Sequence, residues 1–160
     1  MADGRFLAAS EHGAYVLRLV GDVRLTLCAS IEDFVEQMLD DPDFTSVWVD
    51  LCDATGIDST TLGQLAKLAL AVHDRYGFRP AVYCCDAGIN RLLRSMGLDR
   101  LFEMHEKTCC ATGCAQMVPM VPGSEDEVRE RVLEAHRVLM DVSEKNRARF
   151  ADLVSYLERS

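Results

Sequence analysis

The fold of this chain follows from one stretch, Val47-Trp-Val-Asp-Leu-Cys-Asp-Ala-Thr-Gly-Ile-Asp-Ser-Thr-Thr-Leu-Gly-Gln-Leu65. The nearly all-apolar run that opens it, residues 46–51, is typical of a strand buried on both faces. A polar loop follows and leads into apolar positions at helical spacing, which predict a helix from about Thr60 to Tyr76. A strand that leads through a short loop into a helix is the repeating unit of α/β proteins.

The same alternation continues on both sides of this stretch. Apolar and β-branched runs predict strands over 6–10, 15–20, 46–51, 81–85 and 101–104, and helical spacing predicts helices over 30–39, 60–76 and 87–96. A turn near His12-Gly13 joins the first two strands, and Ser30 with Asp33 approximates a capping box at the start of the first helix. This order predicts an α/β fold with helices packed on a mixed, mostly parallel β-sheet.

The chain divides into three parts. Its 160 residues fit one domain with an appendage. The α/β unit occupies residues 1–105, a connecting segment without clear periodicity covers 106–123, and a C-terminal helical extension covers 124–160.

The C-terminal extension is predicted to be helical; the sequence allows one long helix, and a bend or a split is the alternative. Ser124 and Glu127 have the spacing of a capping box, and no Gly or Pro occurs from there to Glu158. Such a helix would be about 50 Å long, which exceeds the side of a small domain. An apolar stripe recurs at steps of three or four residues, at Val128, Val132, Ala135, Leu139, Val142, Asn146, Phe150, Leu153 and Leu157. We expect part of the helix to project and to mediate homo-oligomer formation or a partner contact; alternatively, the stripe lies back along the first unit.

Composition excludes several classes of function. The formal net charge is −9, and an acidic surface repels both phosphate backbones and anionic lipid, so we expect no nucleic-acid and no membrane partner. No run approaches the roughly 20 apolar residues that span a bilayer, and the first residues lack the features of a signal peptide. A cytoplasmic location is the expectation. Seven cysteines are an odd number, which favours reduced thiols over a disulfide framework.

The polar loop places Asp58, Ser59 and Thr60 at a helix start. Unpaired N–H groups and the helix dipole stabilise an anion such as a phosphate there. A simpler interpretation is structural, in which Ser59 or Thr60 caps the helix and Asp58 interacts with the dipole. The spacing alone leaves both interpretations open.

The segment Asp58-Ser59-Thr60-Thr61-Leu62-Gly63 resembles the Asp-Ser-Ser/Thr-Gly/Ala-Leu-Gly signature of bacterial anti-sigma factor antagonists. These are the small STAS domains (sulphate transporter and anti-sigma factor antagonist). Residues 19–22 and 93–102 also agree in order with the family, and the resemblance covers about 5–105. Thr61 departs from it, because the family has Gly or Ala there.

The resemblance implies a STAS fold and a phosphorylation-controlled switch rather than an enzyme, with no cofactor. In the family the first Ser of the motif is phosphorylated by a protein that is both serine kinase and anti-sigma factor; carried over, that residue is Ser59, with Thr60 as second choice. The unmodified domain binds the anti-sigma factor and frees a sigma factor, and a phosphatase resets the switch. Asp58, Ser59, Thr60, Thr61 and Gly63 are the implied partner-binding residues.

Two alternatives stay open. One is a STAS subunit of another signalling or transport assembly. The other is a small α/β enzyme that uses Asp58 and Ser59, which would need a general base beside the hydroxyl. No histidine lies near the motif in sequence, although a distant one could approach it in space; the four histidines are His12, His73, His105 and His136.

The cysteines are predicted to be inert. His105, Cys109, Cys110 and Cys114 lack the paired spacing of a zinc site, so we expect no metal and assign the last three to loop thiols rather than to redox sensing. Cys84 and Cys85 fall in a predicted strand and are expected in the core.

Overall fold

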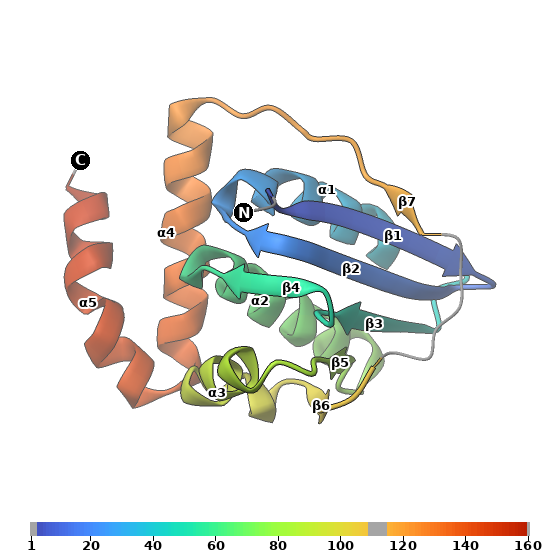
Figure 1. Ribbon diagram of the computed structural model, residues 1–160. Coiled ribbons are helices and arrows are strands. Elements are labelled where there is room, and N and C mark those ends of the chain that lie inside the picture. The colour runs from blue at the N-terminus through green and yellow to red at the C-terminus, as the bar shows by residue number, and fades with distance from the viewer. Residues whose placement is uncertain (1–2, 109–114, 160) are drawn as a thin grey trace.

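The first part of the chain forms a mixed β-sheet with helices packed on it. The structure is a computed structural model that describes residues 3–108 and 115–159 (Figure 1). Its strands are β1 (Arg5–Glu11), β2 (Ala14–Val23), β3 (Ser46–Asp50), β4 (Ala54–Ile57), β5 (Ala81–Tyr83), β6 (Glu103–His105) and β7 (Gln116–Met117). Its helices are α1 (Cys28–Leu39), α2 (Ser59–Tyr76), α3 (Ala87–Ser95), α4 (Glu125–Val142) and α5 (Glu144–Glu158), with short 3-10 turns η1 (Leu25–Leu27) and η2 (Leu98–Arg100).

The strand order in the sheet is β6-β5-β3-β2-β1-β7, and β4 pairs with β2 beyond the end of β3. The β1–β2 and β1–β7 pairs are antiparallel, whereas β2–β3, β2–β4, β3–β5 and β5–β6 are parallel. His12 and Gly13 both have positive φ and form the two-residue turn between β1 and β2. The predicted α/β class with a mixed, mostly parallel sheet is confirmed.

Helices α1 and α2 lie side by side behind the sheet in the view of Figure 1, and α3 lies at its β5–β6 edge. The core is apolar side chains of the strands packed against these helices, and Leu17, Val49, Leu62 and Leu65 are at most 1% exposed. Burial of this kind is the main stabilising term of the fold.

The start of α1 differs from the prediction. The helix begins at Cys28 directly after η1, so Ser30 lies inside it and the predicted capping box is wrong. Ser30 is 1% exposed; its hydroxyl donates to the Pro119 carbonyl and accepts from the Val121 N–H. Through these two hydrogen bonds, Ser30 holds the segment that follows β7 against α1.

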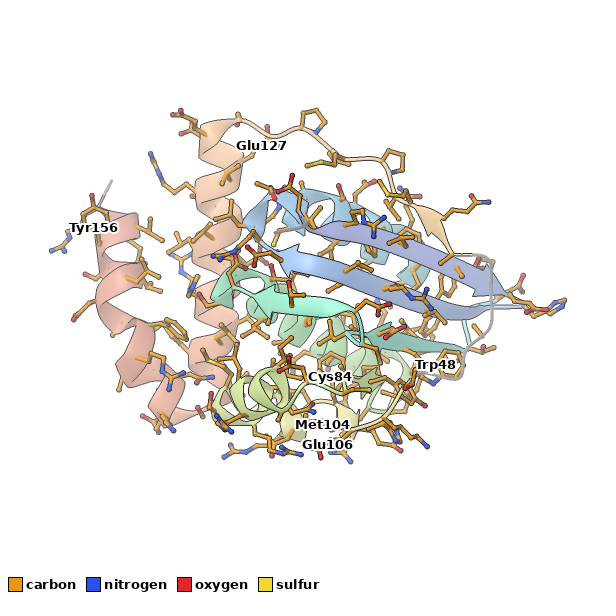
Figure 2. The ribbon with its side chains drawn as sticks, in the orientation of Figure 1. Trp48, Cys84, Met104, Glu106, Glu127 and Tyr156 are labelled. Carbon is orange, nitrogen blue, oxygen red and sulfur yellow. The ribbon has the colours of Figure 1, made fainter. Side chains whose placement is uncertain are left out.

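The C-terminal extension is a hairpin of two helices, which is the split alternative rather than one continuous helix. The helix is interrupted at Ser143, which has extended backbone angles. Its side chain caps α5 by accepting from the Asn146 N–H. Helix α5 then runs back beside α4, and Tyr156 projects to solvent from its outer side (Figures 1 and 2). We refer to α4 and α5 together as the C-terminal hairpin.

The hairpin lies back on the α/β unit, which was the alternative to a projecting helix. Helix α4 packs against α2 and stands at one end of the sheet (Figure 1). Ala135, Leu139, Asn146 and Phe150 of the predicted stripe are buried, whereas Leu153 is 38% exposed. The stripe is thus largely covered within one chain, and homo-oligomer formation through this region stays a prediction.

Helices α2 and α4 approach each other closely at Gly63. A Cβ atom on Gly63 would lie 2.4 Å from the Ala135 carbonyl oxygen and 2.6 Å from the Ala135 Cβ. These distances are well inside van der Waals contact, so only glycine permits this helix spacing.

Hydrogen bonds from one buried side chain hold the turn between α4 and α5 in place. Asn146 is fully buried, and its side-chain amide donates to the carbonyls of Met96, at the end of α3, and Leu139, in α4. One amide thus satisfies two carbonyls that the ends of two helices leave unpaired.

We predict that Gly63→Ala weakens hairpin docking, because the added methyl group overlaps the α4 backbone. Overpacking of this kind costs about 1–3 kcal/mol. Urea unfolding should show the loss, and hydrogen exchange should show faster exchange in α4 and α5 than in β2 and β3. Gly88→Ala is the matched control, since the nearest atom to its added Cβ is the Asp86 carboxylate at 3.1 Å. Equal stability of the two variants would contradict the prediction.

Candidate functional site at the start of α2

The sequence-predicted site lies where β4 ends and α2 begins. Asp58 is the N-cap of α2 and has extended backbone angles, and Ser59 is the first helical residue. The N-cap is therefore Asp58, not Ser59 or Thr60, which corrects the structural interpretation of the motif. The hydroxyls are left available for other contacts.

The Asp58 carboxylate is fully engaged in fixing this corner. One oxygen accepts from the Thr61 N–H at 2.9 Å and from the Thr61 hydroxyl at 2.7 Å. The other accepts from the Leu25 N–H at 2.8 Å. Asp58 therefore joins the start of α2 to the turn that follows β2, and this arrangement sets the position of Ser59.

Ser59 contacts the C-terminal hairpin directly. Its Oγ lies 2.8 Å from Nε2 of His136 in α4, and the serine is half-buried. His136 Nδ1 lies 2.7 Å from the Val132 carbonyl oxygen, which can only accept. The proton on this nitrogen leaves Nε2 of the neutral ring as the acceptor of the Ser59 hydroxyl proton.

His136 is the residue of the candidate site that the sequence did not reveal. It is 2% exposed, and its ring meets Phe150 of α5 edge to face at 4.9 Å. No histidine lies near the motif in sequence, but folding brings His136 to Ser59 across a separation of 77 residues, as the sequence left open. A signal existed: His136 adjoins Ala135, a position of the predicted apolar stripe.

The other predicted partner-binding residues of the motif, apart from Asp58, are buried. Thr60 is 4% exposed, and Thr61 is fully buried with its hydroxyl also 3.6 Å from the Cys28 sulfur. Gly63 lies under Ala135. In the docked arrangement these three residues face protein rather than solvent, and their predicted role in partner binding stays a prediction.

A charged cluster beside the site joins α4 to α1 and α2. Glu32 pairs with Arg131 at 2.6 Å and with Lys67 at 3.5 Å, and Lys67 also pairs with Glu134 at 2.9 Å. Burial opposes ionisation of Glu32, but the hydrogen bond from Arg131 and the charges of Lys67 and Arg131 hold the pKa of its carboxyl below the usual range. Burial likewise opposes the charge on Lys67, whereas Glu134 and Glu32 raise its pKa overall.

The four cysteines among the described residues range from buried to exposed. Cys28 and Cys84 are buried, and burial raises the pKa of the Cys28 thiol to about 11 and raises that of Cys84. Cys85 is exposed, so its assignment to the core is wrong; it lies beyond the end of β5, where the alternation of the strand turns it outward. Cys109, Cys110 and Cys114 lie outside the described residues.

Two further properties bear on function. Within residues 3–108 and 115–159, no group of three or more His, Cys, Asp or Glu side chains is arranged to hold a metal ion. None of the helices in this part of the chain combines the length and the apolar character that crossing a bilayer requires.

Comparison with known proteins neither supports nor opposes a family assignment: no protein-family model matches this chain, and no curated protein matches it significantly.

We predict that Asp58→Ala destabilises the protein by about 1–2 kcal/mol, because the start of α2 loses its cap and the Leu25 N–H loses its acceptor. Asp58→Asn is the comparison variant, since asparagine caps helices about as well as aspartate but its NH2 group cannot accept from the Leu25 N–H. Urea unfolding measures both. A loss in Asp58→Asn as large as in Asp58→Ala would show that the contact to Leu25 or the charge, not the cap, carries the stability.

The charged cluster predicts acid-sensitive docking of α4. The pKa of Glu32 is lower in the folded than in the unfolded protein, so its stabilising contribution is complete above about pH 4.5 and is lost as the pH falls through the folded-state value. Glu32→Gln should therefore flatten the fall in unfolding free energy between pH 7 and pH 3. Glu36→Gln, an exposed position on the same helix, should keep the wild-type slope. Parallel slopes for all three proteins would refute this role of Glu32.

Proposed function

We propose that this chain is a phosphorylation-controlled anti-sigma factor antagonist with a STAS-type domain. In the unphosphorylated form it binds an anti-sigma factor that is also a serine kinase, and a sigma factor is released. Phosphorylation of Ser59 dissociates the complex, and a phosphatase restores the unphosphorylated form. The family resemblance of residues 58–63 supplies the pathway, and the geometry at the start of α2 supports it.

The observation that carries the proposal is the position of the Ser59 hydroxyl. It lies on the first residue of a helix of 18 residues, next to an N-cap that uses a different side chain. A phosphate on this hydroxyl would add about −1.5 to −2 charges beside backbone N–H groups that have no helical partner. The domain can accommodate the modification, while a partner surface placed there would meet a new charge and new bulk.

The C-terminal hairpin adds a condition to this switch. Ser59 is half-buried and bonded to His136, so a kinase reaches the hydroxyl only after α4 has moved away from it. Phosphate transfer to Ser59 also removes the hydroxyl group that forms the hydrogen bond with His136. Hairpin opening would therefore precede modification of Ser59.

We predict that Ser59 is the phosphoacceptor and that His136→Ala speeds its modification at least about fivefold. Loss of one net hydrogen bond of about 1 kcal/mol increases the open population by that factor. Loss of the buried ring contact with Phe150 increases it further. Each purified HATPase-type serine kinase of the source genome is incubated with full-length protein and labelled ATP, and the modified residue is identified by mass spectrometry. Ser59→Ala should abolish labelling. Glu130→Ala, an exposed position on α4, is the control for His136→Ala.

Label that persists in Ser59→Ala would remove Ser59 from the switch. A His136→Ala protein labelled no faster than Glu130→Ala would show that the hairpin does not limit access.

The Ser59–His136 hydrogen bond also favours a second candidate, a hydrolase with a serine nucleophile and a histidine base. The burial of His136 opposes it, since a substrate cannot lie against a ring that is 2% exposed. Hydrolysis of p-nitrophenyl acetate by the full chain distinguishes the two. A turnover rate that both Ser59→Ala and His136→Ala abolish would favour the enzyme over the switch.

A further inference from the structure

A pair of cysteine thiols lies two residues beyond the C-terminal ends of β3 and β5. The sulfur of Cys85 is 3.9 Å from the sulfur of Cys52. Cys85 is exposed and Cys52 is partly exposed. We propose that Cys52 and Cys85 form a reversible disulfide when the protein meets a peroxide.

The register of the sheet produces this pair. Strands β3 and β5 are parallel neighbours in which Asp50 lies opposite Tyr83, and two residues further along each chain are Cys52 and Cys85. Neighbouring strands are about 4.8 Å apart, which lies within the Cα separations of about 4.4–6.8 Å that disulfides span. Side chains alternate along a strand, so Leu51 and Cys84 point into the core while the two cysteines that follow point outward on one face.

The backbone on both sides of the pair is fixed. The Cys52 N–H donates to the buried Asp50 carboxylate at 2.9 Å, and Asp50 is itself paired with Arg18. On the other side, the Cys84 N–H donates to the His105 carbonyl, and Asp86 caps α3. The sulfurs can therefore close to bonding distance by side-chain rotation, without rearrangement of the sheet.

The surroundings of Cys85 admit a small oxidant. Cys85 lines an open cavity of about 390 Å³ together with Asn90, Arg91, Arg94 and Glu106, and Figure 2 labels Glu106 and the neighbouring Cys84 in this region. Cys84 points away from this cavity into the core. The geometry therefore selects Cys85 as the thiol that reacts first.

The reaction balances with hydrogen peroxide as the oxidant. The Cys85 thiolate attacks one peroxide oxygen, the O–O bond breaks, and a sulfenic acid and one water form. The Cys52 thiolate then attacks the Cys85 sulfur, the S–O bond breaks, and hydroxide leaves. The hydroxide takes up the proton that the Cys52 thiol has lost, which gives a second water. Two thiols lose two electrons and two protons in total, and one peroxide molecule takes them up.

The test uses the full chain in a background where Cys109, Cys110 and Cys114 are serine, so that Cys28, Cys52, Cys84 and Cys85 remain. After treatment with hydrogen peroxide, thiol titration should fall by two per chain. Peptide mapping should find Cys52 linked to Cys85 within one molecule, and dithiothreitol should restore both thiols.

Single substitutions identify the pair. Cys52→Ser and Cys85→Ser should each prevent the loss of two thiols, whereas Cys84→Ser, the neighbouring buried position, should leave it intact. A stable sulfenic acid on Cys85 with no disulfide, a cross-link between two chains, or a cross-link to Cys28 or Cys84 would each overturn the proposal. These outcomes are independent of whether Ser59 is phosphorylated.

Discussion

The close approach of α4 to α2 at Gly63 is the constraint on which the candidate site depends. A side chain at this position would hold the helices apart, since its Cβ would lie 2.4 Å from the Ala135 carbonyl oxygen. Ala135 and His136 are adjacent on α4, so the same spacing brings His136 within hydrogen-bonding distance of Ser59. Packing at one glycine therefore decides whether the motif hydroxyl faces solvent or protein.

Polar groups at the interface between α2 and α4 fix how the two helices align. A hydrophobic stripe alone would allow α4 to slide along α2, whereas each polar contact fixes a position. Ser59 with His136 fixes one position of the contact, and Asn146 with the carbonyls of Met96 and Leu139 fixes another. The ion pairs of Glu32 with Arg131 and of Lys67 with Glu134 precede both along the chain of α4, and they remain partly accessible to water, where such pairs contribute modestly.

The sequence predicts the elements better than their contacts. Periodicity located β2, β3 and α2 because each buries an apolar face that repeats at its own spacing. It missed β4, since Ala54-Thr-Gly-Ile57 is four residues long and contains a glycine. It left a split of the C-terminal extension open but did not place it at Ser143, because an N-cap serine without Gly or Pro resembles an ordinary helical residue. Within the site, local pattern identified Asp58 and Ser59, but no local pattern can reveal that His136 lies opposite them.

The hairpin and the proposed switch are linked by free energy. If a kinase or an anti-sigma factor binds only the open form, its apparent affinity falls by the fraction of molecules that are open. Each 1.4 kcal/mol of docking energy then weakens the partner tenfold. Gly63, His136, Asn146 and the ion pairs of α4 all contribute to the docking energy of the hairpin. A substitution at any of these positions would therefore change the apparent affinity of a partner that binds the open form. The sensitivity of the switch would thus be encoded in the hairpin, while its chemistry stays in the motif at the start of α2.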